Sequence, residues 1–204
     1  MELKAHDLVE IAEGAALLSH ETPGWVTGAL RETRTVVVTR GQAPMGFLCV
    51  GIRGRKREER HAAVLREQDV KSWRTPESLA AEKNWSGKSR ITHLPALQSL
   101  ALVAEYAEQV HLDWGPVGSV GYELATGVPT VCAQSDLDVV LRCSVRLDFR
   151  RLKALQQLTS GAPARVDVIL EGPLGGVPLC EFLRSPERCL IKTSVGPRMD
   201  AFRW

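Results

Sequence analysis

Two aspartates separated by a single residue are the strongest chemical signal in the sequence. Asp136 and Asp138 lie in the run Ser135-Asp-Leu-Asp-Val139, and apolar residues follow as far as Arg142. Side chains alternate across a β-strand, so a strand over 136–142 places both carboxylates on one face, roughly 6–7 Å apart. Carboxylates this close repel each other. Mg²⁺ relieves that repulsion and accepts phosphates and water as its other ligands, so the pair predicts a magnesium site.

Two further features support this interpretation. Asp167 faces away from Val166 and Val168 in a predicted strand over 165–170, and it joins the pair if the two strands are neighbours. Upstream, Gly118 and Ser119 stand between a predicted strand and a predicted helix, where backbone N–H groups can hold phosphate oxygens. Asp-x-Asp alone is common on surfaces, and Gly-Ser alone is commonly a plain turn. The three features in this order favour a site for metal and polyphosphate.

The elements that must position these residues are predicted by periodicity and turn signals. In the first half, residues 7–18 favour a short helix, and strands over 35–40 and 47–52 form a plausible hairpin. In the second half, Pro95 suits the first turn of a helix, and a strand over 110–114 leads to a helix that Gly127 ends. Asp148 can cap the next helix.

This pattern predicts an α+β (mixed α/β) fold with two domains. A small N-terminal domain over 1–85 carries the β-hairpin, and a catalytic domain over 93–204 carries a small mixed sheet flanked by helices. The polar stretch over 72–93, with Pro76 and Gly87, contains the predicted junction.

A basic run follows Gly51-Ile-Arg-Gly54, where the two glycines permit a tight turn and close ligand approach. Arg53, Arg57 and Arg60 belong to this run. They form either a solvated face or a site for phosphates or an acidic partner surface. Lys192, near the end of a predicted strand, is a second candidate for phosphate contact, with a solvated strand-end lysine as the equal alternative.

Composition excludes several classes of protein. The 204 residues include 44% apolar and 25% charged residues and have a net charge of +2, which is ordinary for a globular protein. Apolar stretches are too short for a membrane span, and the acidic N-terminus does not resemble a secretory signal. The five cysteines form no CxxC pair. Free thiols in a cytoplasmic protein are the simplest interpretation. The histidines lack zinc-ligand spacing, and no P-loop is present.

The pattern from Gly118-Ser119 to Asp136, Asp138 and Asp167 resembles the polymerase-β-type nucleotidyltransferases. Over Gly115–Gly127 and Ser135–Val139, the sequence is similar to the malonate decarboxylase holo-acyl carrier protein synthases, also called phosphoribosyl-dephospho-CoA transferases. The similarity extends to Gly51-Ile-Arg-Gly54, Arg165-Val-Asp167, and Ile191-Lys-Thr193 with Gly196, and thus covers nearly the whole chain.

The resemblance implies a reaction and its participants. The donor would be 2'-(5''-triphosphoribosyl)-3'-dephospho-CoA, and the acceptor a serine of the apo acyl carrier protein of malonate decarboxylase, with release of pyrophosphate. Asp136 and Asp138 would hold Mg²⁺, Asp167 would hold the metal or activate the serine, and Gly118 and Ser119 would hold the triphosphate.

Two alternatives remain. The first is a nucleotidyltransferase that acts on another acceptor, such as the carrier protein of citrate lyase or a small molecule. The second is a non-enzymatic nucleic-acid-binding module that uses the arginine run. No aromatic residue interleaves with those arginines as a stacking platform, which disfavours nucleic acid.

Overall fold

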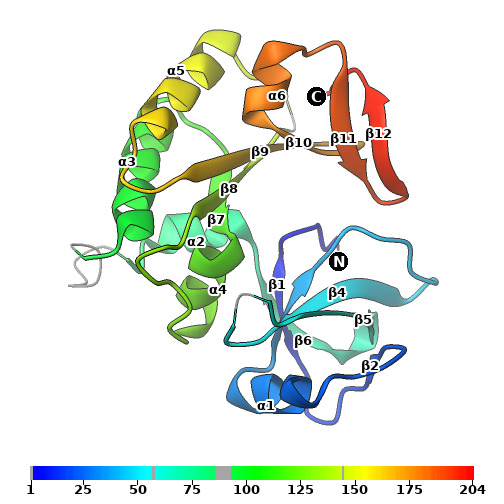
Figure 1. Cartoon of the computed structure of the whole chain (residues 1–204). Coiled ribbons are helices and arrows are strands. Elements are labelled where there is room, and N and C mark those ends of the chain that lie inside the picture. Colours follow the sequence, from blue (N-terminus) through cyan, green and yellow to red (C-terminus); the bar gives the residue numbers. More distant parts are fainter. Residues whose placement is uncertain (1, 57, 86–92, 144) are drawn as a thin grey trace. The chain divides into compact units, whose positions relative to one another are not determined.

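The computed structural model describes residues 2–56, 58–85, 93–143 and 145–204. The chain divides into two compact units, Met1–Thr75 and Pro76–Trp204, called the N-terminal and C-terminal units below (Figure 1). Each unit combines helices with a sheet, so the fold is α+β, as predicted. The boundary between the units lies before the helix α2 (Pro76–Glu82), inside the polar stretch 72–93.

The N-terminal unit is a six-stranded sheet with the order β2-β5-β4-β3-β1-β6. One helix, α1 (Gly24–Glu32), precedes the third strand. The strands are β1 (Leu8–Ile11), β2 (Leu17–Leu18), β3 (Thr35–Val38), β4 (Phe47–Arg53), β5 (Arg60–Arg66) and β6 (Val70–Arg74), with the short 3₁₀ helix η1 (Glu67–Asp69) before β6. The predicted hairpin of β3 and β4 is confirmed, with Val37 opposite Gly51.

The helix predicted over 7–18 is wrong, because β1 and β2 occupy this segment. Val9 and Ile11 are β-branched or bulky apolar residues that suit a pleated surface, and both are buried in the core. β1 pairs with β3 on one side and β6 on the other. A central strand's two neighbours thus override the weak helical periodicity.

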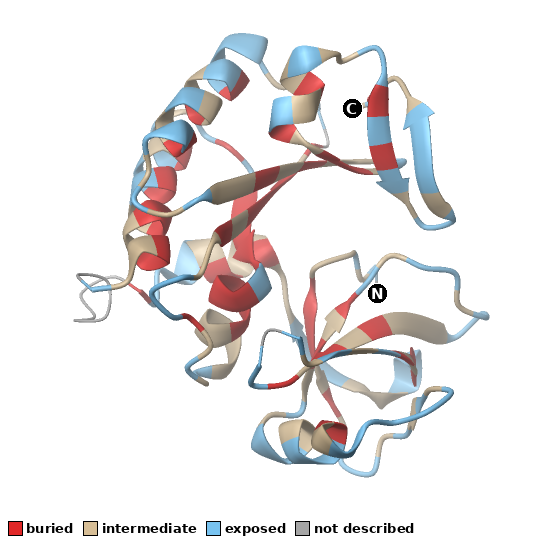
Figure 2. Ribbon diagram, viewed as in Figure 1, coloured by how far each residue is buried: buried red, intermediate tan, exposed pale blue. Residues whose placement is uncertain are grey.

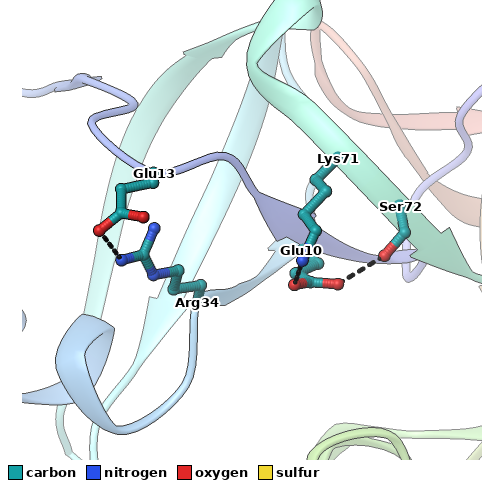
Figure 3. Close-up of polar contacts among 5 residues, drawn as sticks. All are labelled: Glu10, Glu13, Arg34, Lys71 and Ser72. Carbon is teal, nitrogen blue, oxygen red and sulfur yellow. Dashed lines mark hydrogen bonds and ion pairs between the residues drawn. The ribbon is translucent and has the colours of Figure 1, made fainter.

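Across β1 and β6, the polar side chains form local contacts (Figure 3). Glu10 accepts hydrogen bonds from Lys71 Nζ (2.6 Å) and Ser72 Oγ (2.8 Å), both on β6. Nearby, Arg34 Nη2 donates to Glu13 Oε1 at 3.1 Å. These contacts satisfy the carboxylates from within the unit.

The C-terminal unit is a second six-stranded sheet with the order β12-β11-β10-β9-β8-β7. The strands β8 and β9 are parallel, and the other pairs are antiparallel. The strands are β7 (Trp114–Val117), β8 (Leu137–Arg142), β9 (Val166–Gly172), β10 (Gly175–Pro178), β11 (Cys189–Thr193) and β12 (Gly196–Asp200). With α2, the helices are α3 (Pro95–Gln109), α4 (Gly118–Thr126), α5 (Phe149–Ser160) and α6 (Leu179–Arg184).

The core of this unit lies between the sheet and the pair of helices α3 and α5. Leu137, Val139 and Leu141 on alternate positions of β8 are almost fully buried, and they share one cluster with Leu100 of α3 and Leu152 of α5. Figure 2 shows this buried stripe along the strands and along the facing sides of both helices. Burial of the apolar face of β8 leaves its other face to carry Asp138.

Several predicted helix ends are confirmed. α3 begins at Pro95, and α4 ends at Gly127, which adopts a left-handed conformation (φ 74°). Asp148 caps α5 by accepting a hydrogen bond from Arg150 N. The strand predicted over 110–114 begins only at Trp114, because α3 continues to Gln109 and Val110 is its C-cap.

All five cysteines are free thiols, as predicted. In the part of the chain that the structure describes, no helix is both long enough and apolar enough to cross a membrane.

Candidate active site

The parallel pair β8 and β9 brings the predicted carboxylates onto one face. Asp138 lies directly opposite Asp167 in the register of the two strands. Asp136 lies two residues before Asp138 and one residue before the start of β8. If the strand alternation continues to this position, Asp136 is on the same side. We call this side the carboxylate face, defined by Asp136, Asp138 and Asp167. The sequence left open whether these two strands are neighbours, and the structure shows that β8 and β9 are paired.

Gly118 lies against the carboxylate of Asp138 and directly follows β7, the strand on the other side of β8. β7 pairs with β8 so that Val117 is opposite Asp138, and Gly118 follows at the first position of α4 with φ +60°. A Cβ at Gly118 would overlap Oδ2 of Asp138. Glycine is therefore required twice, for its left-handed conformation and for the close approach of the carboxylate.

The N-terminus of α4 beside Asp138 has the properties of a phosphate site. Val117 is its N-cap and provides no side-chain hydrogen bond to the first turn. The first-turn N–H groups of an α-helix have no partners within the helix, and the dipole makes this end positive. Ser119 is in this turn and only 9% exposed. The backbone, more than the buried hydroxyl, is suited to contact phosphate oxygens.

The loop that leads into β8 is fastened to α4. Glu123 Oε2 accepts hydrogen bonds from Thr130 N (2.7 Å) and Val131 N (2.8 Å). Thr130 Oγ1 donates to Ser119 O at 2.9 Å. These bonds join the start of α4 to the segment that carries Asp136. They therefore fix the phosphate-binding end of the helix relative to the aspartates.

The segment before β9 is held by a buried serine of α3. Ser99 Oγ accepts from Ala164 N and donates to Pro95 O, both at 2.9 Å, and the side chain is fully buried. Leu137 N also donates to Arg165 O at 2.9 Å, which extends the β8–β9 ladder by one position. Arg165 is thereby placed opposite Asp136 at the entrance of the two strands.

Arg165 is the basic partner of Asp167. Its Nε and Nη2 donate to Asp167 Oδ1 at 3.1 and 3.0 Å, and Nη2 lies 2.9 Å from Oδ2. The hydrogen bond to Asp167 raises the pKa of Arg165, and the charges of Asp167, Asp136 and Asp138 add to this effect. The three aspartates and Arg165 thus form one electrostatic group.

Whether this group suits a divalent cation depends on its donors and their present partners. Its oxygens are hard ligands of the kind that Mg²⁺ prefers, and Gly118 leaves Asp138 room. Among the described residues, no three His, Cys, Asp or Glu side chains are already arranged to hold a metal ion. Asp167 is turned to Arg165. A cation on this face would therefore require Asp167 to exchange Arg165 for the metal ion.

Lys192 lies apart from the carboxylate face. It pairs with Gly176 of β10, which is opposite Glu171 of β9, and Glu171 is level with Arg142 of β8. Arg142 and Glu171 are four residues beyond Asp138 and Asp167 along β8 and β9. Lys192 is on β11, two strands away from β9. Strand spacings give a separation of roughly 16 Å. The structure does not bring Lys192 to the aspartates.

The predicted arginines belong to the N-terminal unit. Arg53 and Arg60 are opposite each other in β4 and β5. Arg60 Nη1 donates to the carbonyl groups of Lys56 (3.2 Å) and Glu59 (2.9 Å), within its own turn. Arg57 lies outside the described residues. A phosphate-binding role of these arginines stays a prediction.

Both units of the chain match domains of a known enzyme family. The chain matches the phosphoribosyl-dephospho-CoA transferase MdcG N-terminal domain over residues 4–76 and the C-terminal domain of the same transferase over residues 81–201. Both units therefore belong to one enzyme architecture, that of a transferase.

Curated relatives extend over almost the whole chain. A phosphoribosyl-dephospho-CoA transferase of Pseudomonas putida (strain W619) is 36% identical over 201 residues, which are 98% of this chain and 94% of the relative. The enzyme of Azotobacter vinelandii is 36% identical over 92% of this chain and 88% of its own length. That of Klebsiella pneumoniae (strain 342) is 34% identical, with 98% and 96% covered. No solved structure matches the chain. The chain belongs to the phosphoribosyl-dephospho-CoA transferase family.

Proposed function

We propose that this transferase attaches the 2'-(5''-phosphoribosyl)-3'-dephospho-CoA group to a serine of the apo acyl carrier protein of malonate decarboxylase, with the carboxylate face as its active site. The donor is the triphosphate precursor of that group. The observation that carries the assignment is the register of Asp138 and Asp167 beside Gly118. Family membership supports the chemical class of the donor.

In the proposed reaction, a bond forms between the serine oxygen and the phosphorus nearest the ribose. The bond from that phosphorus to the oxygen shared with the next phosphorus breaks, and pyrophosphate leaves with this oxygen. The serine proton passes to Asp167 or to water. Asp136, Asp138 and Asp167 would hold Mg²⁺. When bound, it would neutralise charge that develops on phosphate oxygens in the transition state.

The chain's own residues perform the binding and orientation. The N–H groups at the start of α4, from Gly118 and Ser119 onward, hold the polyphosphate. Their distance from the aspartates is fixed by Glu123 and by the contact of Thr130 with Ser119. A rigid frame of this kind is needed, because an error of about 1 Å in the reacting geometry costs about 100-fold in rate.

The test is a transfer assay with the purified full-length chain, the triphosphate donor and a panel of acceptors. Mass spectrometry of the carrier protein should show the added group on the malonate decarboxylase carrier, together with pyrophosphate release. Modification of the citrate lyase carrier in its place would support the other acceptor and refute this one. Absence of pyrophosphate release with every acceptor would refute the proposed reaction.

A further inference from the structure

The arrangement of like charges on the carboxylate face poses an electrostatic problem. Asp138 and Asp167 are direct neighbours across two strands, and like charges in that position destabilise a sheet. Asp136 adds a third negative charge on the same side. In the described structure, Arg165 donates through Nε and Nη2 to Asp167 and supplies one positive charge to the group.

The geometry of Arg165 makes it exchangeable. It is adjacent to the start of β9, and its side chain is 77% exposed, whereas Asp167 is 40% exposed. Exposed ion pairs are weak, because water screens the charges and both side chains lose freedom. The Asp167 oxygens that Arg165 contacts are also oxygens that a cation would need. Arg165 and a cation therefore compete for one ligand.

We propose that Arg165 is the exchangeable counter-ion of the carboxylate face. It offsets negative charge in the cation-free protein, gives up Asp167 when a divalent cation binds, and then pairs with phosphate oxygens of the donor. This inference rests on the proposed function, because it takes the carboxylate face as the cation site. It assigns Arg165 a role in binding the donor, which a purely structural ion pair would not have.

The chain contains a matched control for this proposal. Arg198 and Asp200 of β12 form an ion pair with the same spacing of two residues, with Nη2 2.8 Å from Oδ2. Arg198 is similarly exposed, at 68%. It is opposite Ile191 of β11, away from β8 and β9 in the strand order. A purely structural role for such pairs would make both substitutions behave alike.

The first experiment measures Mn²⁺ binding to the full chain without donor, by electron paramagnetic resonance. Arg165→Gln should tighten Mn²⁺ binding about three-fold to ten-fold, because it removes both a competitor for Asp167 and a repelling charge. Arg198→Gln should leave the affinity unchanged. Arg165→Lys, which keeps the charge without the fork of donors, should fall between wild type and Arg165→Gln. Equal or weaker Mn²⁺ binding by Arg165→Gln would overturn the proposal.

The second experiment separates KM from kcat. Arg165→Gln should raise the KM for the donor several-fold, because the guanidinium no longer meets its phosphates, while the Mn²⁺ concentration needed for half-maximal rate falls. An unchanged KM would refute the contact with phosphate.

If wild type binds no Mn²⁺, or Asp138→Asn binds it as tightly, the metal site fails and the Arg165 proposal fails with it. If wild type binds Mn²⁺ and Arg165→Gln binds it equally, the metal site stands and the Arg165 proposal alone fails.

Discussion

Glu10 in the N-terminal unit and the carboxylate face in the C-terminal unit place acidic side chains on strands in opposite ways. Glu10 meets Lys71 and Ser72 on the facing strand, so each of its oxygens has a donor across the sheet (Figure 3). Asp138 meets another aspartate, Asp167, across β8 and β9. Facing groups of opposite charge stabilise a sheet, whereas facing groups of like charge destabilise it.

The difference indicates which carboxylates serve a ligand. A sheet needs no pair of facing aspartates, and apolar or oppositely charged pairs would be more stable. The core under β8 is nevertheless almost fully buried, so it can support this unfavourable face. Unfavourable charge interactions of this kind are common at functional sites. We therefore expect substitutions in the two regions to affect stability and activity in opposite directions.

The largest expected effect is that of Asp138→Asn. The substitution keeps the shape of the side chain and removes one of the facing charges, so the cation-free protein should be as stable as wild type or more stable by up to about 1 kcal/mol. Transfer should fall by orders of magnitude, because a cation ligand is lost. Stabilisation by Mg²⁺ with donor should disappear.

Melting curves with and without Mg²⁺, recorded beside the transfer assay, check both parts. A structural aspartate would behave in the reverse way, with lower stability and retained activity. An active but destabilised Asp138→Asn protein would therefore end the assignment of the carboxylate face as the active site.

The second effect concerns Gly118, and Gly127 provides its control. Both glycines have positive φ values, 60° and 74°, so alanine costs about 1 kcal/mol of conformational strain at either position. A Cβ at Gly118 would overlap Asp138, whereas one at Gly127 meets no atom within 4 Å. Gly118→Ala should therefore reduce transfer about 100-fold or more, and Gly127→Ala should leave it nearly unchanged.

Thermal unfolding measures the strain that both variants share and the added cost of the overlap with Asp138 in Gly118→Ala. The transfer assay measures the effect of each substitution on catalysis. If the two alanine variants lose activity equally, the proximity of Gly118 to Asp138 has no role in catalysis.

The sequence alone predicted the parts of the site that depend on local order. Strand alternation predicted Asp138 on the polar side of β8, with Asp136 just before the strand on the same side. Gly127 and Asp148 marked helix ends through local backbone chemistry. These features need only neighbours in sequence. The approach of Asp167 to Asp138 depends on the pairing of β8 with β9, and a sequence does not state which strands are adjacent.

The sequence did not predict the contacts that join distant segments. Ser99 reads as an ordinary helix residue, yet it holds Ala164, which is 65 positions away. Thr130 bonds to Glu123 and to Ser119 O only because the chain folds back after Gly127. Arg165 belongs to the motif Arg165-Val-Asp167, but its ion pair with Asp167 depends on side-chain geometry that the motif does not specify. The helix predicted over 7–18 is wrong because β1 is stabilised by two partner strands that are distant in sequence.

The smallest expected effect is that of Glu10→Gln, which tests the other side of the comparison. The hydrogen bond from Lys71, followed by that from Ser72, lowers the pKa of Glu10 below its ordinary range. A carboxyl whose pKa is lowered by folding adds stability above its unfolded pKa and loses it as the pH falls through the folded pKa. Because Glu10 is at the surface, the loss of its charge should lower Tm by at most about 2 °C at pH 7.

This difference between wild type and Glu10→Gln should shrink as the pH falls below about 4.3, the ordinary pKa of glutamate. It should also shrink at 1 M salt, where the Debye length is only about 3 Å. Transfer activity should not change. Melting curves from pH 3 to pH 7 provide the measurement, with Glu13→Gln as control, because Glu13 contacts Arg34 rather than Lys71. A Tm difference that grows toward low pH would show that Glu10 does not stabilise the sheet through its charge.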